Sequence, residues 1–199
     1  MAEIKEIVKI IFSPMAVLSM TLVVLLIGRY IFKLRYINCF DIIKEHFNCF
    51  RKVNGKMSYV AIVVYFGIPL LLDVGILQIR EIDDSAINII TIIISILTSM
   101  FFTLLTLILD MRERVKSNPR YNAADAAISS KILREMYYAI MFEVLISTVI
   151  LVLCFIELFA QKFTKIESFV IYYLTFVMLI NLFMILKRIF KVIDKDLKS

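Results

Sequence analysis

Residues 122–160 read NAADAAISSKILREMYYAIMFEVLISTVILVLCFIELFA, a run without glycine or proline. Asn122 can cap a helix, and the carboxylate of Asp125 favours a helix N-terminus. At 1.5 Å per residue a continuous helix here would be roughly 57 Å long, well beyond the ~30 Å hydrocarbon core of a bilayer. The segment is therefore predicted to begin in water, to enter the membrane near Tyr137 and Tyr138, and to carry one carboxylate, Glu143, into the lipid.

The whole chain has the composition of a membrane protein. Of its 199 residues 61% are apolar, and the mean hydropathy is +0.89, above the range of a soluble domain of this size. Stretches nearly free of charge predict five transmembrane helices, with four as the alternative, at about 13–33, 57–79, 86–109, 137–160 and 166–187. The sequence thus predicts a single-domain, all-α, polytopic membrane protein.

Lysine and arginine residues predict how the helices are oriented. With five spans, 18 of the 23 basic residues fall on one side of the membrane and five on the other. The positive-inside rule then places the N-terminus outside and segments 34–56, 110–136 and 188–199 in the cytoplasm. The net charge of +6 is therefore assigned to topology, and direct nucleic-acid binding is not expected. Abundant isoleucine and lysine with only four glycines favours a bacterial inner membrane as the location.

The cytoplasmic segments carry the features of an interaction surface. Aromatic and aliphatic residues recur at helical spacing from Tyr36 to Phe50, which predicts an amphipathic helix lying on the inner leaflet or packed on a partner. Basic residues that can dock a cytoplasmic protein or membrane lipids accompany it: Arg51, Lys52, Lys56, Arg112, Arg114, Arg120, Lys131 and Arg134.

Glu143 is the candidate functional carboxylate of the inner leaflet. It lies about 9 Å below Tyr137 along the helix, and an unpaired carboxylate at that depth is costly. Arg29 and Asn181 reach similar depths in their own spans, so one of them is the expected partner. A structural ion pair is one interpretation of this group, and an ion or proton pathway is the other.

The span at 86–109 carries its polar side chains on one helical face: Asn88, Thr91, Ser95, Ser99, Thr103 and Thr106. This stripe is interpreted either as close helix packing through small residues and hydroxyls or as the lining of a pore. Asp73, near the outer end of its own span, is expected to be hydrogen-bonded by Thr91 or Ser95. Because one copy of five helices hardly encloses a pathway, the chain is expected to form a homo-oligomer.

The sequence does not indicate catalysis. Cys39, His46 and Cys49 are residue types that bind metals, but structural zinc sites use four ligands at tighter, paired spacing. No phosphate-binding loop, metalloprotease signature or paired catalytic acids occur, and no serine or cysteine has a convincing base partner. The chain is therefore expected to be no enzyme and to hold no metal or cofactor. The sequence 164–167, Thr-Lys-Ile-Glu, matches a capping box at the start of the last span.

The segment 111–121, Met-Arg-Glu-Arg-Val-Lys-Ser-Asn-Pro-Arg-Tyr, leads into the long helix at 122–160. In length, helix number and basic cytoplasmic loops the chain resembles the membrane subunit of the Kiwa anti-phage defence system. That family is usually described with four spans, against the five predicted here. The resemblance implies an oligomeric membrane sensor of infection that docks a cytoplasmic DNA-binding effector, and it carries no site residues over. A small oligomeric ion channel or ion-coupled transporter is the competing interpretation.

Overall fold

The computed structural model describes residues 39–51, 57–117, 123–157 and 164–198, together with five helical positions before residue 28. These residues are helical apart from short connections and one isolated bridge between Arg51 and Met57, so the prediction of an all-α protein is confirmed. Most of the predicted span 13–33, the helix start at 34–38, and four of the predicted site residues lie outside the described residues: Arg29, Lys52, Lys56 and Arg120.

Five helices follow one another in the described part of the chain: α3 (Phe40–Asn48), α4 (Tyr59–Ile79), α5 (Asp84–Ser117), α6 (Ala123–Glu157) and α7 (Lys165–Lys198). Helices α4 to α7 are long and apolar enough to cross a membrane, which agrees with four of the predicted spans. Helices α5, α6 and α7 have 34, 35 and 34 residues. Each is therefore about 50 Å long and exceeds the hydrocarbon thickness by roughly 20 Å.

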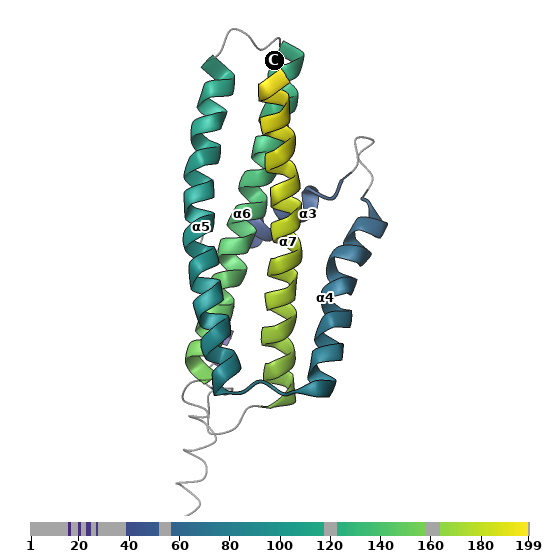
Figure 1. Cartoon of the computed structure of the whole chain (residues 1–199), viewed down its shortest axis with the longest axis vertical. Helices are drawn as coiled ribbons and strands as arrows, with labels where there is room; N and C mark the ends of the chain where they lie inside the picture. Colours follow the sequence, from purple (N-terminus) through teal and green to yellow (C-terminus); the bar gives the residue numbers. More distant parts are fainter. Residues whose placement is uncertain are drawn as a thin grey trace, which may run out of the picture.

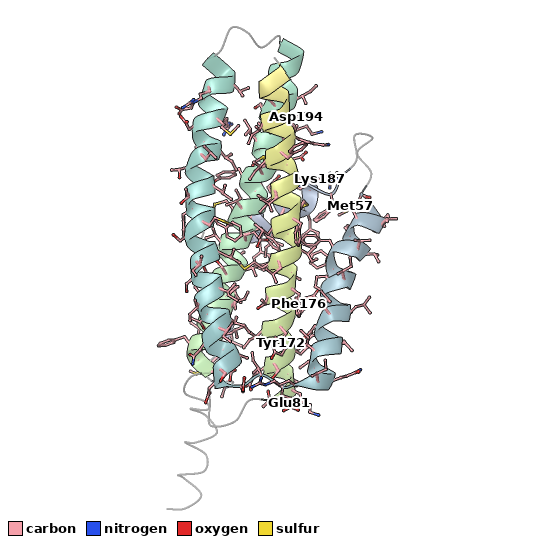
Figure 2. The ribbon with its side chains drawn as sticks, viewed as in Figure 1. Met57, Glu81, Tyr172, Phe176, Lys187 and Asp194 are labelled. Carbon is pink, nitrogen blue, oxygen red and sulfur yellow. The ribbon has the colours of Figure 1, made fainter. Side chains whose placement is uncertain are left out.

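The long helices stand side by side in the order α5, α6, α7, α4 (Figure 1). Helix α6 packs against α5, α7 and α3, whereas α4 packs mainly on α7. Helices α4 and α6 begin, and α5 and α7 end, at what we call the basic end of the bundle. At this end α5, α6 and α7 extend further than α4. Met57 immediately precedes α4 in the chain, and Asp194 of α7 lies well beyond the level of Met57 (Figure 2).

Burial follows from this helix order. The side chains of Leu133, Ala139 and Ile150 on α6 are fully buried, because that helix has neighbours on several sides. Leu71 of α4 and Ile96 of α5 are 75% and 64% exposed. Apolar side chains that project outward from the two outer helices are compatible with contact to acyl chains and not with contact to water.

Helix α3 is packed on its own chain. The sequence predicts that its aromatic face meets the lipid or a separate partner, but α3 lies against α6. His46 is fully buried there, while Phe40, the first aromatic residue of α3, is 53% exposed. Phe47 stacks on Phe66 and Phe50 meets Tyr65, both on α4. The expectation of a separate protein partner for this face is therefore corrected: the surface that covers it belongs to α6 and α4 of the same chain.

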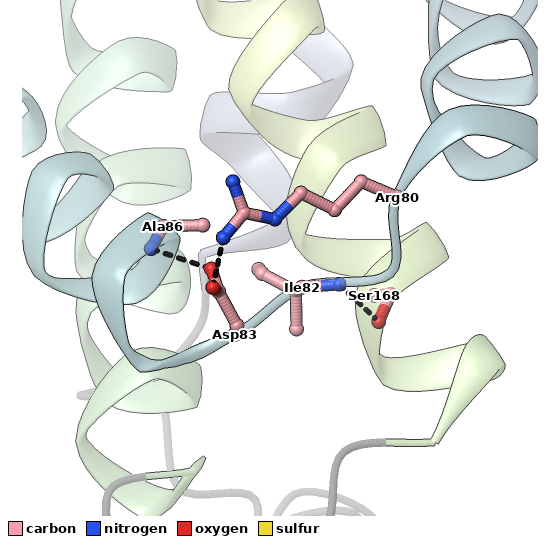
Figure 3. Close-up of polar contacts among 5 residues, drawn as sticks. All are labelled: Arg80, Ile82, Asp83, Ala86 and Ser168. Carbon is pink, nitrogen blue, oxygen red and sulfur yellow. Dashed lines mark hydrogen bonds and ion pairs between the residues drawn. The ribbon is translucent and has the colours of Figure 1, made fainter.

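Three polar contacts organise the turn between α4 and α5 (Figure 3). The guanidinium of Arg80 donates a hydrogen bond to Asp83 Oδ2, and the backbone N–H of Ala86 donates to Asp83 Oδ1 at 3.0 Å. The Ala86 N–H and Arg80 hold the pKa of the Asp83 carboxyl below its usual range. The backbone N–H of Ile82 donates to Ser168 Oγ at 3.2 Å, which ties this turn to the start of α7.

The capping box predicted at the start of α7 is confirmed. The Thr164 N–H donates to Glu167 Oε2 at 2.7 Å, and the Glu167 N–H donates to Thr164 Oγ1 at 3.3 Å. Two backbone donors that have no partner within the helix are thereby satisfied. The Ser168 hydroxyl in turn donates to the Thr164 carbonyl at 3.1 Å, so the cap and the α4–α5 turn form one connected network.

Replacing Ser168 by alanine is expected to destabilise this end of the bundle. The substitution leaves the N–H of Ile82, a residue only 3% exposed, without its acceptor, and an unsatisfied buried donor costs about 1–3 kcal/mol. The measurement is the thermal unfolding midpoint in detergent. The matched control is Thr148→Ala, which removes an exposed hydroxyl bonded only to the Val144 carbonyl of its own helix. Equal midpoints for the two variants would contradict the expectation.

Candidate functional site

Polar side chains from four helices meet inside the bundle, towards its basic end. His46 of α3, Tyr65 of α4, Glu143 of α6 and Asn181 of α7 are between 0% and 4% exposed. The side chain of Arg188, two turns further along α7, is 14% exposed. We call these five residues the buried polar cluster. Groups of this kind are rarely buried in lipid-embedded helices without a role in packing or function.

Aromatic rings enclose the imidazole of His46. It stacks on Phe142 with ring centroids 3.9 Å apart, and the rings of Phe50 and Tyr65 lie at 5.5 and 5.8 Å. Neither ring nitrogen has a hydrogen-bond partner among the described residues. Burial lowers the pKa of His46 to about 3, and the Arg188 guanidinium adds to the effect, because both disfavour the imidazolium ion. His46 is therefore neutral near pH 7.

Glu143 is bonded to Asn181. The side-chain amide of Asn181 donates a hydrogen bond to Glu143 Oε1. Of the two partners expected from the sequence, Asn181 is thus the one placed against the carboxylate, and Arg29 lies outside the described residues. Within those residues Glu143 Oε2, Asn181 Oδ1 and the Tyr65 hydroxyl have no further partner. The cluster therefore keeps unused hydrogen-bonding capacity in its apolar surroundings, where unpaired polar atoms are costly.

Contacts around Arg188 attach α3 to the two helices behind it. The guanidinium of Arg188 lies 3.6 Å from a carboxylate oxygen of Glu135 on α6. The thiol of Cys49 donates to the Glu135 carbonyl at 3.7 Å and to the Glu45 carbonyl at 3.3 Å. Burial raises the pKa of the Cys49 thiol. Because the thiol stays protonated at neutral pH, it acts here as a hydrogen-bond donor.

Two grooves open beside the cluster at the basic end. One, with a volume of about 150 Å³, lies between α3 and α6, and we call it the α3–α6 groove; its lining is Glu45, Asn48, Cys49, Arg51, Lys131, Arg134, Glu135 and Tyr138. The other, of about 260 Å³, is the α6–α7 groove, lined by Ile132, Glu135, Met184, Lys187, Arg188 and Lys191. Both grooves thus combine three basic side chains with the carboxylate of Glu135.

The predicted docking cations separate into two places. Three of them come together in the α3–α6 groove: Arg51, Lys131 and Arg134. Arg112 and Arg114 are exposed on α5, where Arg114 pairs with Asp110 at 3.0 Å. The structure therefore assembles part of the predicted docking set into one surface and leaves the described remainder on a different helix.

Other members of the site were not predicted from the sequence. No sequence pattern marks Tyr65, and the sequence indicates His46 only as a metal-ligand type. Lys187 and Lys191 were used only to assign topology, although their spacing of four residues places them on one helical face. That spacing is the one sequence signal for the α6–α7 groove. Its apolar lining residues, Ile132 and Met184, cannot be distinguished in the sequence from residues that face lipid.

The predicted partners of Asp73 are wrong. Asp73 is fully buried, and neither carboxylate oxygen has a hydrogen-bond partner among the described residues. It lies on α4, which packs mainly on α7, while the Ser95 hydroxyl donates to the Thr91 carbonyl of its own helix at 2.7 Å. The physical reason is helix order, since α4 packs mainly on α7 and not on α5.

Five of the six residues in the polar stripe of α5 point away from the bundle, and Thr91 is half-buried. Asn88, Ser95, Ser99, Thr103 and Thr106 are exposed. The Thr103 and Thr106 hydroxyls donate to the carbonyls of Ser99 and Phe102 at 3.2 and 2.9 Å, within their own helix. Across the described part of one copy, the exposed members of this stripe are therefore used neither for packing on α6 nor for lining a passage.

No arrangement for a metal ion is found among the residues whose side chains are described. Cys39 and Cys49 are free thiols, and Cys49 is engaged with backbone carbonyls. The His46 ring is enclosed by aromatic neighbours and not by other ligand types. Of the three ligand-type residues, His46 thus serves packing and Cys49 hydrogen bonding in this structure.

Removing one partner of the Glu143–Asn181 pair is expected to cost more than removing both. Asn181→Leu leaves a buried carboxylate without its donor and should lower stability by about 1–3 kcal/mol. Glu143→Leu/Asn181→Leu replaces both groups by apolar side chains and should recover most of that loss. A double-mutant cycle from unfolding in detergent measures the coupling. If the double variant loses the sum of the two single effects, the pair is not coupled.

His46 is expected to make the fold sensitive to acid. Its pKa is about 3 in the folded chain against an ordinary value of 6.5, so between these values the unfolded chain binds a proton that the folded chain does not. Stability therefore falls as the pH drops from about 6.5 towards 3. His46→Phe retains a ring against Phe142 but cannot titrate, and its unfolding midpoint should change less between pH 7.5 and about 4.5. An unchanged pH dependence in this variant would count against the assignment.

The comparisons with known proteins do not assign the chain to a family. Comparison of the chain with protein families, with curated proteins and with solved structures found no match. Function therefore has to be argued from the chain itself: four helices that can span a membrane, a buried polar cluster between them, and two basic grooves at one end. On this basis the chain is an integral membrane protein.

Proposed function

We propose that this chain is a non-enzymatic membrane subunit that holds a cytoplasmic protein at the inner face of a bacterial membrane. The observation that supports this most directly is the extension of α5, α6 and α7 past α4 at the basic end (Figure 1). The positive-inside rule assigns that end to the cytoplasm. We call residues 110–117, 123–136 and 188–198 the stalk.

The stalk is built as a packed support. Val115 of α5, Leu133 of α6 and Val192 of α7 are 7%, 0% and 5% exposed. Burial of apolar side chains between helices that have left the membrane stabilises their association. A packed stalk presents a defined surface to a partner, whereas a flexible charged tail would present none.

The α6–α7 groove provides a binding surface at the base of the stalk. Its apolar floor is formed by Ile132 and Met184, and Lys187 and Lys191 are exposed at its rim. The third cation, Arg188, already lies beside Glu135. A groove of this kind suits an amphipathic helix with acidic residues along its polar edges. The proposed partner therefore presents an acidic, amphipathic segment.

The resemblance to the Kiwa membrane subunit suggests the setting of this proposal. It supports anti-phage defence as the process, perturbation of the membrane during infection as the trigger, and a cytoplasmic DNA-binding effector as the docked protein. A DNA-binding protein needs a basic surface for its nucleic acid. The segment that occupies the α6–α7 groove would then lie on a separate, acidic part of that effector.

A small homo-oligomeric ion channel or ion-coupled transporter is the second candidate function. The outward-facing hydroxyl stripe of α5 favours it, because contact between copies through this face would bring several stripes together. Small and hydroxyl-bearing residues also let helices of separate copies approach closely. Under both candidates we propose that the chain forms a homo-oligomer through α5.

Charge reversal in the α6–α7 groove is expected to release the docked protein. Lys187→Glu/Lys191→Glu should reduce the amount of a stoichiometric partner that co-purifies in detergent from the native host by about tenfold or more, because each rim contact becomes repulsive. The measurement is quantitative mass spectrometry of the purified complex. The matched control is Arg112→Glu/Arg114→Glu, an equal charge change on the α5 side of the stalk.

Two results would contradict this function. Loss of the partner only in the control pair would remove the α6–α7 groove from the proposal. Absence of any stoichiometric partner, combined with ion flux through reconstituted liposomes that Thr103→Leu abolishes, would replace the docking function by the channel.

A further inference from the structure

We infer that the α3–α6 groove binds the phosphate of an anionic phospholipid from the leaflet at the basic end. This site is separate from the α6–α7 groove and does not depend on the docking function. The inference rests on the depth of the groove, the sequence of side chains down α6, the balance of charge in the groove, and the apolar surface below it.

The groove lies where the bundle meets the lipid headgroups. Helix α4 has 21 residues and is therefore about 31 Å long, close to the hydrocarbon thickness. Its start marks the boundary of the apolar layer, and Arg51 lies beside that start because it forms a bridge with Met57 and the Ser58 N–H donates to the Phe50 carbonyl at 3.1 Å. The α3 side of the groove is thus placed at headgroup level.

Along α6 the lining changes from basic to aromatic. Lys131, Arg134 and Tyr138 are spaced by three and four residues, so they lie above one another on one helical face. The two cations are on the side of the stalk, and Tyr138 is on the side of the membrane. A phenol below two cations is the order expected at a bilayer surface, where the ring lies among the upper acyl carbons and its hydroxyl among the headgroups.

Charge and size select a phosphate. Three exposed cations line the groove, Arg51, Lys131 and Arg134. Of its two carboxylates, Glu135 already lies 3.6 Å from Arg188, which leaves Glu45. The Asn48 amide and the Tyr138 hydroxyl add neutral donors. A volume of about 150 Å³ is below the ~300 Å³ at which pockets for whole drug-sized ligands begin, and it suits a single headgroup.

The apolar surface below the groove favours a lipid over other anionic ligands. On the face of α6 that carries Tyr138, the next positions towards the membrane centre are apolar: Met141, Leu145, Val149 and Val152. Val149 and Val152 are 44% and 50% exposed. An acyl chain attached to a phosphate in the groove can lie along this track, whereas a free phosphate or an acidic peptide gains nothing from it. The occupant is therefore a phospholipid.

Binding of such a lipid would attach α3 to α6. Asn48 and Arg51 belong to the α3 side of the groove, and Lys131 and Arg134 belong to α6. One phosphate that accepts hydrogen bonds from both sides adds to the stacking of His46 on Phe142. The lipid thus stabilises the helix that covers the buried polar cluster.

The test is native mass spectrometry of the full chain in detergent, titrated with dioleoyl-phosphatidylglycerol or dioleoyl-phosphatidylcholine. The wild-type chain is expected to bind the anionic lipid about tenfold or more tightly than the zwitterionic one. Arg51→Ala/Lys131→Ala/Arg134→Ala should bind both lipids equally. The control, Arg112→Ala/Lys187→Ala/Lys191→Ala, removes three cations outside the groove and should keep the preference.

Several results of this experiment would overturn the inference. Preference for the anionic lipid in the groove variant would mean that the three groove cations do not bind it. Equal loss of the preference in the control would mean that the cations act only through overall charge. Full displacement of the lipid by inorganic phosphate would show a free-anion site. Circular dichroism of the groove variant in zwitterionic detergent should match the wild-type spectrum, because the three changed side chains are exposed; Arg134→Glu alone should reverse the preference if the groove variant does not fold.

Discussion

A carboxylate in the hydrocarbon region has to be covered and bonded by protein, because lipid offers it neither water nor a hydrogen-bond donor. Glu143 meets this requirement through the amide of Asn181, so α7 has to lie against α6 at that level. The rings of Phe142, Tyr65 and His46 close the neighbouring space. Helix α3, which has only nine residues, is held beside this region by the stacking of His46 on Phe142 and by the Cys49 thiol, which donates to the Glu135 carbonyl.

The central position of α6 connects the buried polar cluster with the surfaces at the basic end. Glu135, two turns from Glu143 along this helix, faces Arg188 and lines both grooves. A partner in one groove and a lipid in the other would therefore act on the same α6 segment. Under the two proposals, this shared segment would be the physical connection between a bound lipid and the docked protein.

The candidate site could be predicted only in part. Glu143 and Asn181 stand out because each is a polar group at a similar depth in an apolar span, and depth can be read from sequence. The partners of Asp73 could not be read in the same way, since depth alone does not say whether α5 or α7 lies next to α4. The burial of His46 could not be read from the sequence for a related reason, because the rings of Tyr65 and Phe142 that cover it come from distant parts of the chain.

The sequence by itself determined the helical class, four described helices that can span a membrane, the basic end and the cap at Thr164, because helix length, charge and local hydrogen bonds depend on neighbouring residues. Only the tertiary structure decided the helix order, the burial of His46 and the grouping of Arg51 with Lys131 and Arg134. The reason is that lipid is as apolar as leucine or isoleucine, so in membrane helices an apolar face does not reveal whether it meets another helix or the bilayer.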